Sequence, residues 1–431
     1  MNRQILRIAI PSILTNIAVP LLGMADAAIA GHMGSAVFIA AIALGSTFVS
    51  MAYWGFGFLR MSTGGLTAQA CGEGDIDKCS FLLRRSIVWA LIIAAVLLLV
   101  HRPLLVVALY FAEATEAVKL AATTYFNIVI WGAPAVLTTS CMSGWFIGMQ
   151  HAKEPLYIAL LQNVLNIILS ALLVFGFGWK MEGVALGTFV SQYVGMALAT
   201  HYAVRLGGIA FRTSTLRISW ADLFDTSFAV ANRDIFLRSF CLLAVTTFFT
   251  FAGARQGEVV LAANALLMQF FLLFSYMMDG FAYAAEALCG KAFGAQRLDE
   301  YARTVRALMC WGALLAAIFA LLYATAGSLL IGLLTDVRIV AQAAVVYLPY
   351  MAMVPVVSFV AFLCDGIFIG TSQTRQMLQT MLGATAPFFA VYYFAPQGWG
   401  NNALWAAFLA YLFVRSIVAY WLSTSIAVKK S

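Results

Sequence analysis

The chain has 431 residues, of which 63% are hydrophobic and only 10% are charged. A soluble domain carries roughly 25% charged residues and needs a polar surface, so this composition excludes an ordinary water-soluble fold. The net charge of +7 would suit either a nucleic-acid partner or a membrane protein, and the placement of the basic residues decides between the two.

Twelve apolar stretches follow one another along the chain, each close to the roughly 20 residues that cross the hydrocarbon layer of a bilayer. They predict an all-α integral membrane protein with twelve transmembrane helices. The predicted spans lie at roughly 5–30, 37–59, 86–109, 123–147, 157–178, 183–204, 226–252, 260–288, 307–332, 341–370, 377–395 and 403–426.

The basic residues gather on one side of these spans. With the N-terminus placed in the cytoplasm, 19 of the 25 Lys and Arg fall inside, Arg238 among them, and five fall outside. Arg415 lies within the last span and has no partner that the sequence identifies. This positive-inside bias predicts a multi-pass protein of the cytoplasmic (inner) membrane with both termini inside, and it explains the charge without nucleic acid. The seven cysteines lack Cys-x-x-Cys spacing, so we expect neither a disulfide framework nor a metal site.

Short motifs recur between the two halves of the chain. "IAAIAL" at 39–44 returns as "LAANAL" at 261–266, and "GWFIG" at 144–148 returns as "GIFIG" at 366–370, at the same offset along the chain. Cys71-Gly72 matches Cys289-Gly290 at a slightly shorter offset, which implies a small length difference between the halves.

The repeat predicts two six-helix bundles related by a parallel pseudo-two-fold axis around a V-shaped central cleft, because each half would hold six spans and begin on the same side. We expect a first lobe at 1–210 that couples to a cation, a cytoplasmic linker at 211–225 and a second lobe at 226–431. Two similar bundles around a cleft are typical of transporters that alternate access to a site near the bilayer midplane. A larger bundle without transport is the alternative.

Carboxylates inside membrane helices are costly and usually face a cavity or a partner. Asp26 lies in the first span after Pro11 and Pro20, and prolines there favour a bendable helix beside an ionisable group. For the other embedded acids, structural and functional roles remain equally open. These acids are Asp279, Glu286 and Asp365.

Spans four to six carry polar side chains that either join helices or line a wet cavity. Asn163, Asn166 and Ser170 share one helix face because their spacing is i, i+3 and i+7. The full set is Tyr125, Asn163, Asn166, Ser170, Thr188 and Gln192.

The sequence resembles the multidrug and toxic compound extrusion (MATE) family, in its DinF-like branch. The resemblance covers nearly the whole chain. It includes "MADAAIAGHMG", "FLRMSTGGLTAQACGEGD", "GWFIGMQHAKEP", "NRDIFLRSFCL", "VVLAANALLMQFFLLFSYMMDGFAYAAEALCGKAFGA" and "DGIFIG". It implies export of organic compounds in exchange for H⁺ or Na⁺.

By position, Asp26 matches the family's coupling carboxylate, with Asn166, Thr188 and Tyr125 as its polar neighbours. Pro11 falls where the family has a kink-forming proline, and Pro20 would add to the same hinge. Ser170 stands where the family commonly has a second Asp, and the stretch "CLLAVTTFFTF" of the seventh span carries no acid. Because Na⁺ prefers several oxygen ligands with more than one negative charge, these departures favour H⁺ over Na⁺ as the coupling ion.

We therefore expect a secondary antiporter, without metal or organic cofactor, that exports cationic or amphiphilic organic compounds as a monomer in the lipid bilayer. Substrate would lie against aromatic, Met and polar side chains of the eighth and tenth spans, although in so apolar a chain such residues are often packing residues. The candidates are Met268, Gln269, Phe270, Tyr276, Asp279 and Asp365.

Rival interpretations are a Na⁺-coupled exporter of the same fold and a flippase for lipid-linked precursors of a related family. A flippase would need a strongly cationic cleft, whereas only Arg415 is plainly within a span. A channel is disfavoured by the embedded acid and the two-lobe repeat. An enzyme is disfavoured because the four histidines are scattered and no His-Glu-x-x-His or phosphate loop is present.

Overall fold

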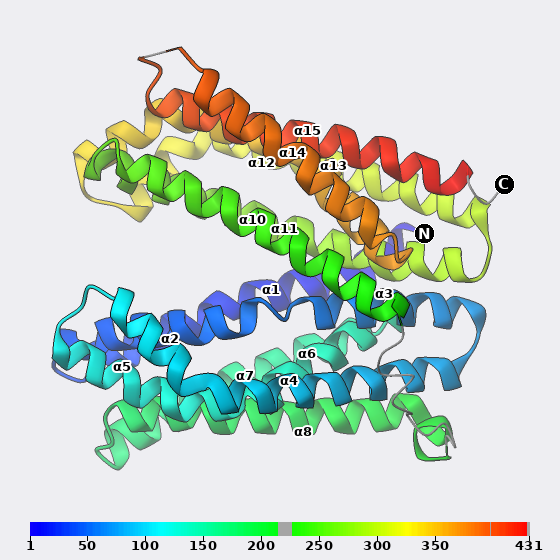
Figure 1. The fold of residues 1–431 in the computed structure, drawn as a ribbon, viewed down its shortest axis with the longest axis horizontal. Helices are drawn as coiled ribbons and strands as arrows, with labels where there is room; N and C mark the ends of the chain where they lie inside the picture. Colours follow the sequence, from blue (N-terminus) through cyan, green and yellow to red (C-terminus); the bar gives the residue numbers. More distant parts are fainter. Residues whose placement is uncertain (214–225, 397, 429–431) are drawn as a thin grey trace. The chain divides into compact units, whose positions relative to one another are not determined.

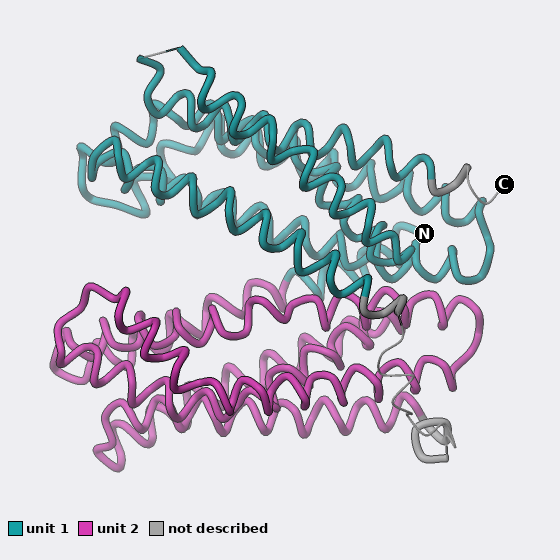
Figure 2. Tube along the Cα trace, in the orientation of Figure 1, with its two compact units in different colours: residues 1–13, 229–431 teal, residues 14–228 magenta. Residues whose placement is uncertain are grey.

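The computed structural model describes residues 1–213, 226–396 and 398–428. Within these ranges the chain is almost entirely helical and contains no strand (Figure 1). It forms two compact units, which Figure 2 separates by colour. Unit 1 comprises residues 1–13 and 229–431, and unit 2 comprises residues 14–228. The predicted all-α class is confirmed.

Unit 2 is built from the larger part of α1 (Asn2–Gly31) and the helices up to α8. Within it, α3 packs along α6, α2 along α5, and α7 along α8. A short 3₁₀ segment interrupts one span between α5 and α6, and a π-helical segment ends another after α7. The elements are α2 (Ala36–Trp54), α3 (Phe58–Glu73), α4 (Ile76–Phe111), α5 (Glu116–Val129), η1 (Ile130–Gly132), α6 (Ala133–Gly148), α7 (Lys153–Ala171), η2 (Leu172–Gly176) and α8 (Met181–Thr213).

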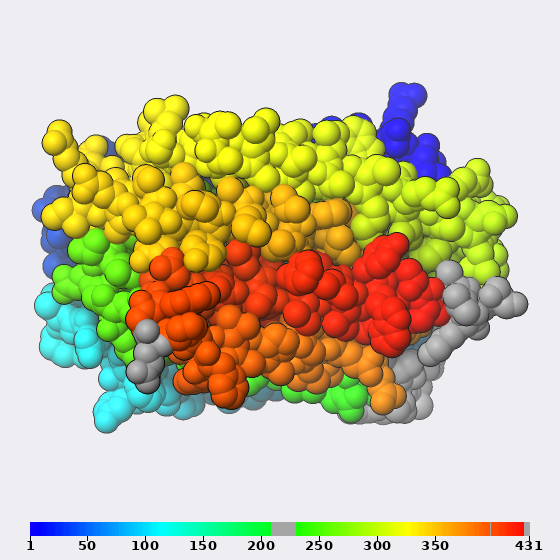
Figure 3. All heavy atoms as spheres, turned by 90° about the horizontal axis from the view of Figure 1, so that it is seen from above, coloured from blue at the N-terminus to red at the C-terminus, as the bar shows by residue number. Residues whose placement is uncertain are grey.

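Unit 1 contains the first turns of α1 and the six helices of the second half. Here α11 packs along α13, and α15 packs between α13 and α14. Figure 3 shows one face of this unit, where α15 (red) lies between the yellow helices and α14 (orange). The helices are α10 (Thr226–Ala254), α11 (Glu258–Gly294), α12 (Leu298–Leu334), α13 (Arg338–Gly370), α14 (Thr374–Phe394) and α15 (Asn401–Val428).

Eleven helical segments of the described chain are long and apolar enough to cross a membrane. The remaining predicted span, 377–395, is present as α14 with 21 residues but lies outside that set. Several helices are longer than their predicted spans, and α11 and α12 have 37 residues each. The helices extend beyond the apolar stretches because charged residues at their ends remain good helix formers.

Close helix contacts at glycine reveal the repeat within each unit. In unit 2, Gly144 and Gly148 of α6 lie directly against the backbone of α3. A Cβ atom added to Gly144 would lie 2.2 Å from the carbonyl oxygen of Arg60, and one added to Gly148 would lie 2.6 Å from that of Gly64. Only glycine permits this approach of two backbones.

Unit 1 contains the same contacts between α13 and α11. A Cβ atom on Gly366 would lie 2.1 Å from the carbonyl oxygen of Ala282, and one on Gly370 would lie 2.4 Å from that of Glu286. Each of these four residues stands at one common offset from its counterpart in unit 2, the same offset that separates the "GWFIG" and "GIFIG" motifs. The duplicated design is thus visible in the packing of each unit.

The turns after α3 and α11 show that the predicted match between Cys71 and Cys289 is not the structural one. Gly74 and Gln296, which are separated by the same offset as those motifs, both adopt a left-handed backbone conformation, with φ of 78° and 58°. The N–H of Gly74 donates to the carbonyl of Cys71, and that of Gln296 donates to the carbonyl of Phe293. The counterpart of Cys71 is therefore Phe293, and the match to Cys289 was wrong, because a two-residue motif is too short to fix a register.

The boundary between the units falls inside α1, after Ile13. Before this point α1 packs tightly on α11, since a Cβ atom on Gly280 would lie 2.8 Å from the carbonyl oxygen of Ala9. The compact grouping therefore takes the first turns of α1 out of the lobe expected at 1–210. Most of the linker expected at 211–225 lies outside the described residues.

Candidate functional site

A carboxylate buried in an apolar helix is the centre of the candidate site in unit 2. Asp26 lies near the C-terminal end of α1 with only 4% of its surface exposed. Its Oδ1 atom has no hydrogen-bond partner among the described residues. Asp26 interacts electrostatically with Tyr125 of α5, which is itself buried. A buried acid without an opposite charge is unusual because the ionised form is poorly solvated there.

Tyr125 connects the acid to α8. Its ring packs against Gly45 of α2, where a Cβ atom would lie 2.7 Å from a ring carbon. Its hydroxyl lies within hydrogen-bonding reach of the Thr188 side chain. Because Gly45 has no side chain, the ring of Tyr125 fits inside unit 2 between Asp26 and Thr188.

The α7–α8 contact completes the polar group. The Nδ2 atom of Asn166 donates to Oγ1 of Thr188 at 2.9 Å, and Thr188 in turn donates to the carbonyl of Val184 at 3.1 Å. Oδ1 of Asn166 has no partner among the described residues. Asp26, Tyr125, Thr188 and Asn166 therefore form a continuous series of neighbouring polar side chains, as the sequence predicts for their positions.

Ser170 contacts the backbone of α8 rather than the side chains around Asp26. Its Oγ atom donates to the carbonyl of Val184 at 3.5 Å, and Gly187 allows the close approach, since a Cβ atom there would lie 2.2 Å from this hydroxyl. Ser170 thus holds α7 against α8. Asn163 on the same face reaches α1 instead, where its Nδ2 atom donates to the carbonyl of Ala18 at 2.7 Å. The polar stripe on α7 therefore joins helices as well as lining the acid site.

The two prolines of the predicted hinge do not break α1. The helix continues from Asn2 to Gly31 through Pro11, which is buried, and Pro20, which is exposed. Each proline removes one backbone donor from the helix. The hinge role stays a prediction.

A second ionic group lies within unit 1. Asp365 of α13 accepts hydrogen bonds through Oδ2 from Arg238 of α10 and from Arg415 of α15, the latter at 2.5 Å. All three residues are more than nine-tenths buried. The partner of Arg415, which the sequence left open, is therefore Asp365. Arg238, which the sequence analysis counts on the inner side, lies inside α10 and pairs with Asp365; its side of the membrane stays a prediction.

The other predicted substrate residues have unequal surroundings. Phe270 is a packing residue, since its ring stacks on Tyr323 with centroids 5.2 Å apart and its carbonyl accepts the Tyr323 hydroxyl at 2.7 Å. Asp279 is half-buried and interacts electrostatically with Arg415. Of the remaining three, Met268 and Tyr276 are half-buried and Gln269 is exposed.

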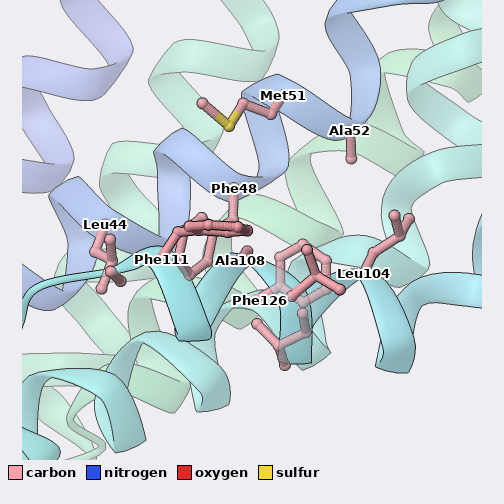
Figure 4. Close-up of a pocket in the computed structure, with 11 residues that line it drawn as sticks. Leu44, Phe48, Met51, Ala52, Leu104, Ala108, Phe111 and Phe126 are labelled. Atoms are coloured by element: carbon pink, nitrogen blue, oxygen red, sulfur yellow. The ribbon is translucent and has the colours of Figure 1, made fainter.

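Unit 2 also has an apolar pocket of about 540 Å³ that sequence reasoning missed (Figure 4). Phe48 and Phe126 lie in it beside Phe111 at the end of α4. Its labelled side chains come from α2, α4 and α5 and carry no charge. Such a lining suits an acyl chain or an apolar ring, and no signal in the sequence distinguishes it from ordinary helix packing.

Comparison with known proteins links this architecture to one family. The sequence profile of the MatE family matches residues 11–172 and 235–395, one copy in each half. DNA damage-inducible protein F of Escherichia coli is 35% identical over 97% of this chain and 92% of its own length. A probable multidrug resistance protein NorM of Rhizobium meliloti is 26% identical over 97% of this chain and 92% of its own length.

Solved structures share the fold at low sequence identity. The crystal structure of MATE in the bent conformation superimposes with a TM-score of 0.90 at 16% identity, covering 100% of this chain and 96% of that one. An outward-facing structure of a multidrug resistance MATE family transporter gives a TM-score of 0.88 at 16% identity, covering 99% of this chain and 96% of that one. At this identity the likeness concerns the fold alone.

Proposed function

Because the chain belongs to the MatE family of multi-pass membrane transporters, we propose that it exports organic compounds, cationic or amphiphilic, in exchange for protons that bind Asp26. The observation that carries this proposal is the buried carboxylate of Asp26, whose Oδ1 has no partner among the described residues and whose mapped neighbours are neutral. Such a group can change charge by taking one proton.

Neutral neighbours favour a proton over a sodium ion. Na⁺ is a hard cation that prefers several oxygen ligands. Here Thr188 already donates to Val184 and accepts from Asn166, so its oxygen is largely engaged. Ser170 provides a hydroxyl where a second carboxylate would strengthen a cation site, and that hydroxyl points to the Val184 carbonyl. Na⁺ coupling is the alternative that the experiment below tests.

The proposed cycle uses Asp26 as the group that senses the two faces of the membrane. With the site open to the outside, Asp26 binds a proton, and substrate leaves. The protonated protein then opens to the cytoplasm, releases the proton and binds substrate again. Protonation biases the two conformations only by the difference in proton affinity of Asp26 between them. A hundredfold difference corresponds to about 2.7 kcal/mol, which is sufficient to drive the change.

The membrane orientation and assembly belong to the same proposal. The positive-inside bias of the sequence supports cytoplasmic termini. A single chain contains both units, so we propose that a monomer transports. The match to the MatE family model favours an exporter of organic compounds over a flippase for lipid-linked precursors, which would belong to a related family.

Efflux from proteoliposomes tests the proposal. The purified protein is reconstituted with a fluorescent organic cation inside, and either a pH gradient or a Na⁺ gradient is imposed. We expect the pH gradient to drive efflux, Asp26→Asn to abolish it, and Asp336→Asn, a control at an exposed position between α12 and α13, to leave it unchanged. Full activity of Asp26→Asn would refute the role of Asp26, and efflux driven by Na⁺ alone would refute proton coupling.

A further inference from the structure

The ion cluster in unit 1 uses only part of its hydrogen-bonding capacity. Arg238 and Arg415 both donate to the same atom, Oδ2 of Asp365. Oδ1 of Asp365 and the Nε atoms of both arginines have no partner among the described residues. A guanidinium carries five donors in a planar fork, so most of the donors of this pair have no acceptor that the described contacts supply.

The charges of the cluster do not cancel within it. Two guanidinium groups donate to one carboxylate, so these hydrogen-bonded pairs alone do not balance the positive charge. A buried charge among membrane-spanning helices is costly unless it is compensated. Asp279 of α11 also interacts electrostatically with Arg415. Asp279 is also only half-buried and has contacts of its own.

We propose that Arg238 and Arg415 bind an acidic group, a carboxylate, sulfonate or phosphate, of an amphiphilic substrate. Asp365 holds the two guanidinium groups in position while the substrate is absent. The planar fork of arginine matches the two oxygens of an oxyanion, which gives both strength and orientation. This inference rests on the proposed export function and narrows its amphiphilic substrates to those that carry an acid.

The surroundings of the cluster leave it accessible on one side and apolar on another. The side chains of Arg238 and Asp365 each keep 10% of their surface exposed, whereas that of Arg415 keeps 3%. An oxyanion therefore approaches past Arg238. The guanidinium of Arg415 lies 5.8 Å from the ring centroid of Phe362, and this ring provides an apolar surface for the body of the ligand.

Equilibrium binding to the purified full-length protein in detergent tests the inference without any ion gradient. The probes are a dansyl-labelled undecanoic acid and its uncharged primary amide, which differ only in the acidic group. We expect the wild type to bind the acid about tenfold more tightly than the amide. Arg238→Gln and Arg415→Gln should each remove most of this preference, while Arg306→Gln, at an exposed position of α12, should preserve it.

Asp365→Asn separates recognition from a purely structural role. Removing the competing carboxylate should raise the affinity for the acid several-fold and leave that for the amide unchanged. If the cluster only ties α10, α13 and α15 together, Asp365→Asn and both arginine variants all weaken the binding of acid and amide alike, and that result overturns the inference. Equal binding of acid and amide by the wild type overturns it without any variant.

The two proposals fail separately. If the wild type binds the acid preferentially but shows no proton-driven efflux, the export cycle at Asp26 is refuted and the acid site is not. Proton-driven efflux without an acid preference would refute the acid site alone.

Discussion

Replacing Gly144 with alanine puts a methyl group 2.2 Å from the carbonyl oxygen of Arg60, a distance that backbone atoms cannot relieve without separating α6 from α3. Overpacking of this kind costs about 1–3 kcal/mol. Alanine regains about 1 kcal/mol in helix propensity. The net loss of unfolding free energy should therefore be about 0–2 kcal/mol, and about 1–3 kcal/mol relative to an alanine that nothing obstructs. Gly366→Ala should cost the same, because its methyl group would lie 2.1 Å from the carbonyl oxygen of Ala282.

Gly383→Ala is the matched control. This glycine lies inside α14, and a Cβ atom there has no neighbour within 4 Å. Alanine should therefore stabilise the protein by up to about 1 kcal/mol through helix propensity. Unfolding in mixed micelles with increasing SDS, followed by tryptophan fluorescence, measures all three variants. Equal stability of Gly144→Ala and Gly383→Ala would show that the close α3–α6 contact is not as tight as the structure has it.

Three further predictions concern polar contacts inside the units. Thr188→Val removes the acceptor of the buried α7 amide, so it should lower unfolding free energy by about 1–3 kcal/mol and reduce proton-driven efflux, whereas Thr188→Ser should retain both properties. Gly132→Ala should lower the melting temperature because its Cβ would lie 1.7 Å from Oε1 of Gln192, and Gln192→Ala in the same chain should restore it. Asn264→Leu leaves the side chain of Asn401 without its reciprocal partner; it should destabilise by about 1–3 kcal/mol, and adding Asn401→Leu should recover part of that loss in the same SDS titration.

The features that the sequence predicted well are those with a strong physical signature. A carboxylate in a long apolar stretch stands out, so Asp26 was singled out. The nearness of Asn166 and Thr188 to it was implied by the resemblance to the family. The repeat was found because glycines that permit close backbone contact leave motifs such as "GWFIG" and "GIFIG". In both cases the residue type follows from its immediate surroundings: an acid within an apolar helix, or a glycine where two backbones touch.

The features that were missed depend on how far a helix continues and how it is rotated. Arg238 lies within the predicted span 226–252 but was counted on the inner side, because composition does not reveal how deep in a helix a residue lies or which way it faces. The partner of Arg415 was not identified, although Asp365 was recognised as embedded, because a contact between distant helices leaves no local pattern in the sequence. Phe270 was considered for substrate because aromatic content alone does not reveal that its ring is stacked on Tyr323.

The duplicated scaffold explains how one chain can combine two kinds of chemistry. At the offset that the paired glycine contacts share, Ser143 of α6 stands where α13 has Asp365, so the paired helices keep their glycine contacts while the adjacent side chain changes from hydroxyl to carboxylate. Unit 2 instead places its acid on α1 among neutral dipoles, where a proton can bind without displacing an ion pair. In unit 1 the carboxylate of Asp365 instead accepts hydrogen bonds from two guanidinium groups. We therefore propose different partners for the two carboxylates: the coupling proton for Asp26, and, for Asp365 with its arginines, the acidic group of the substrate.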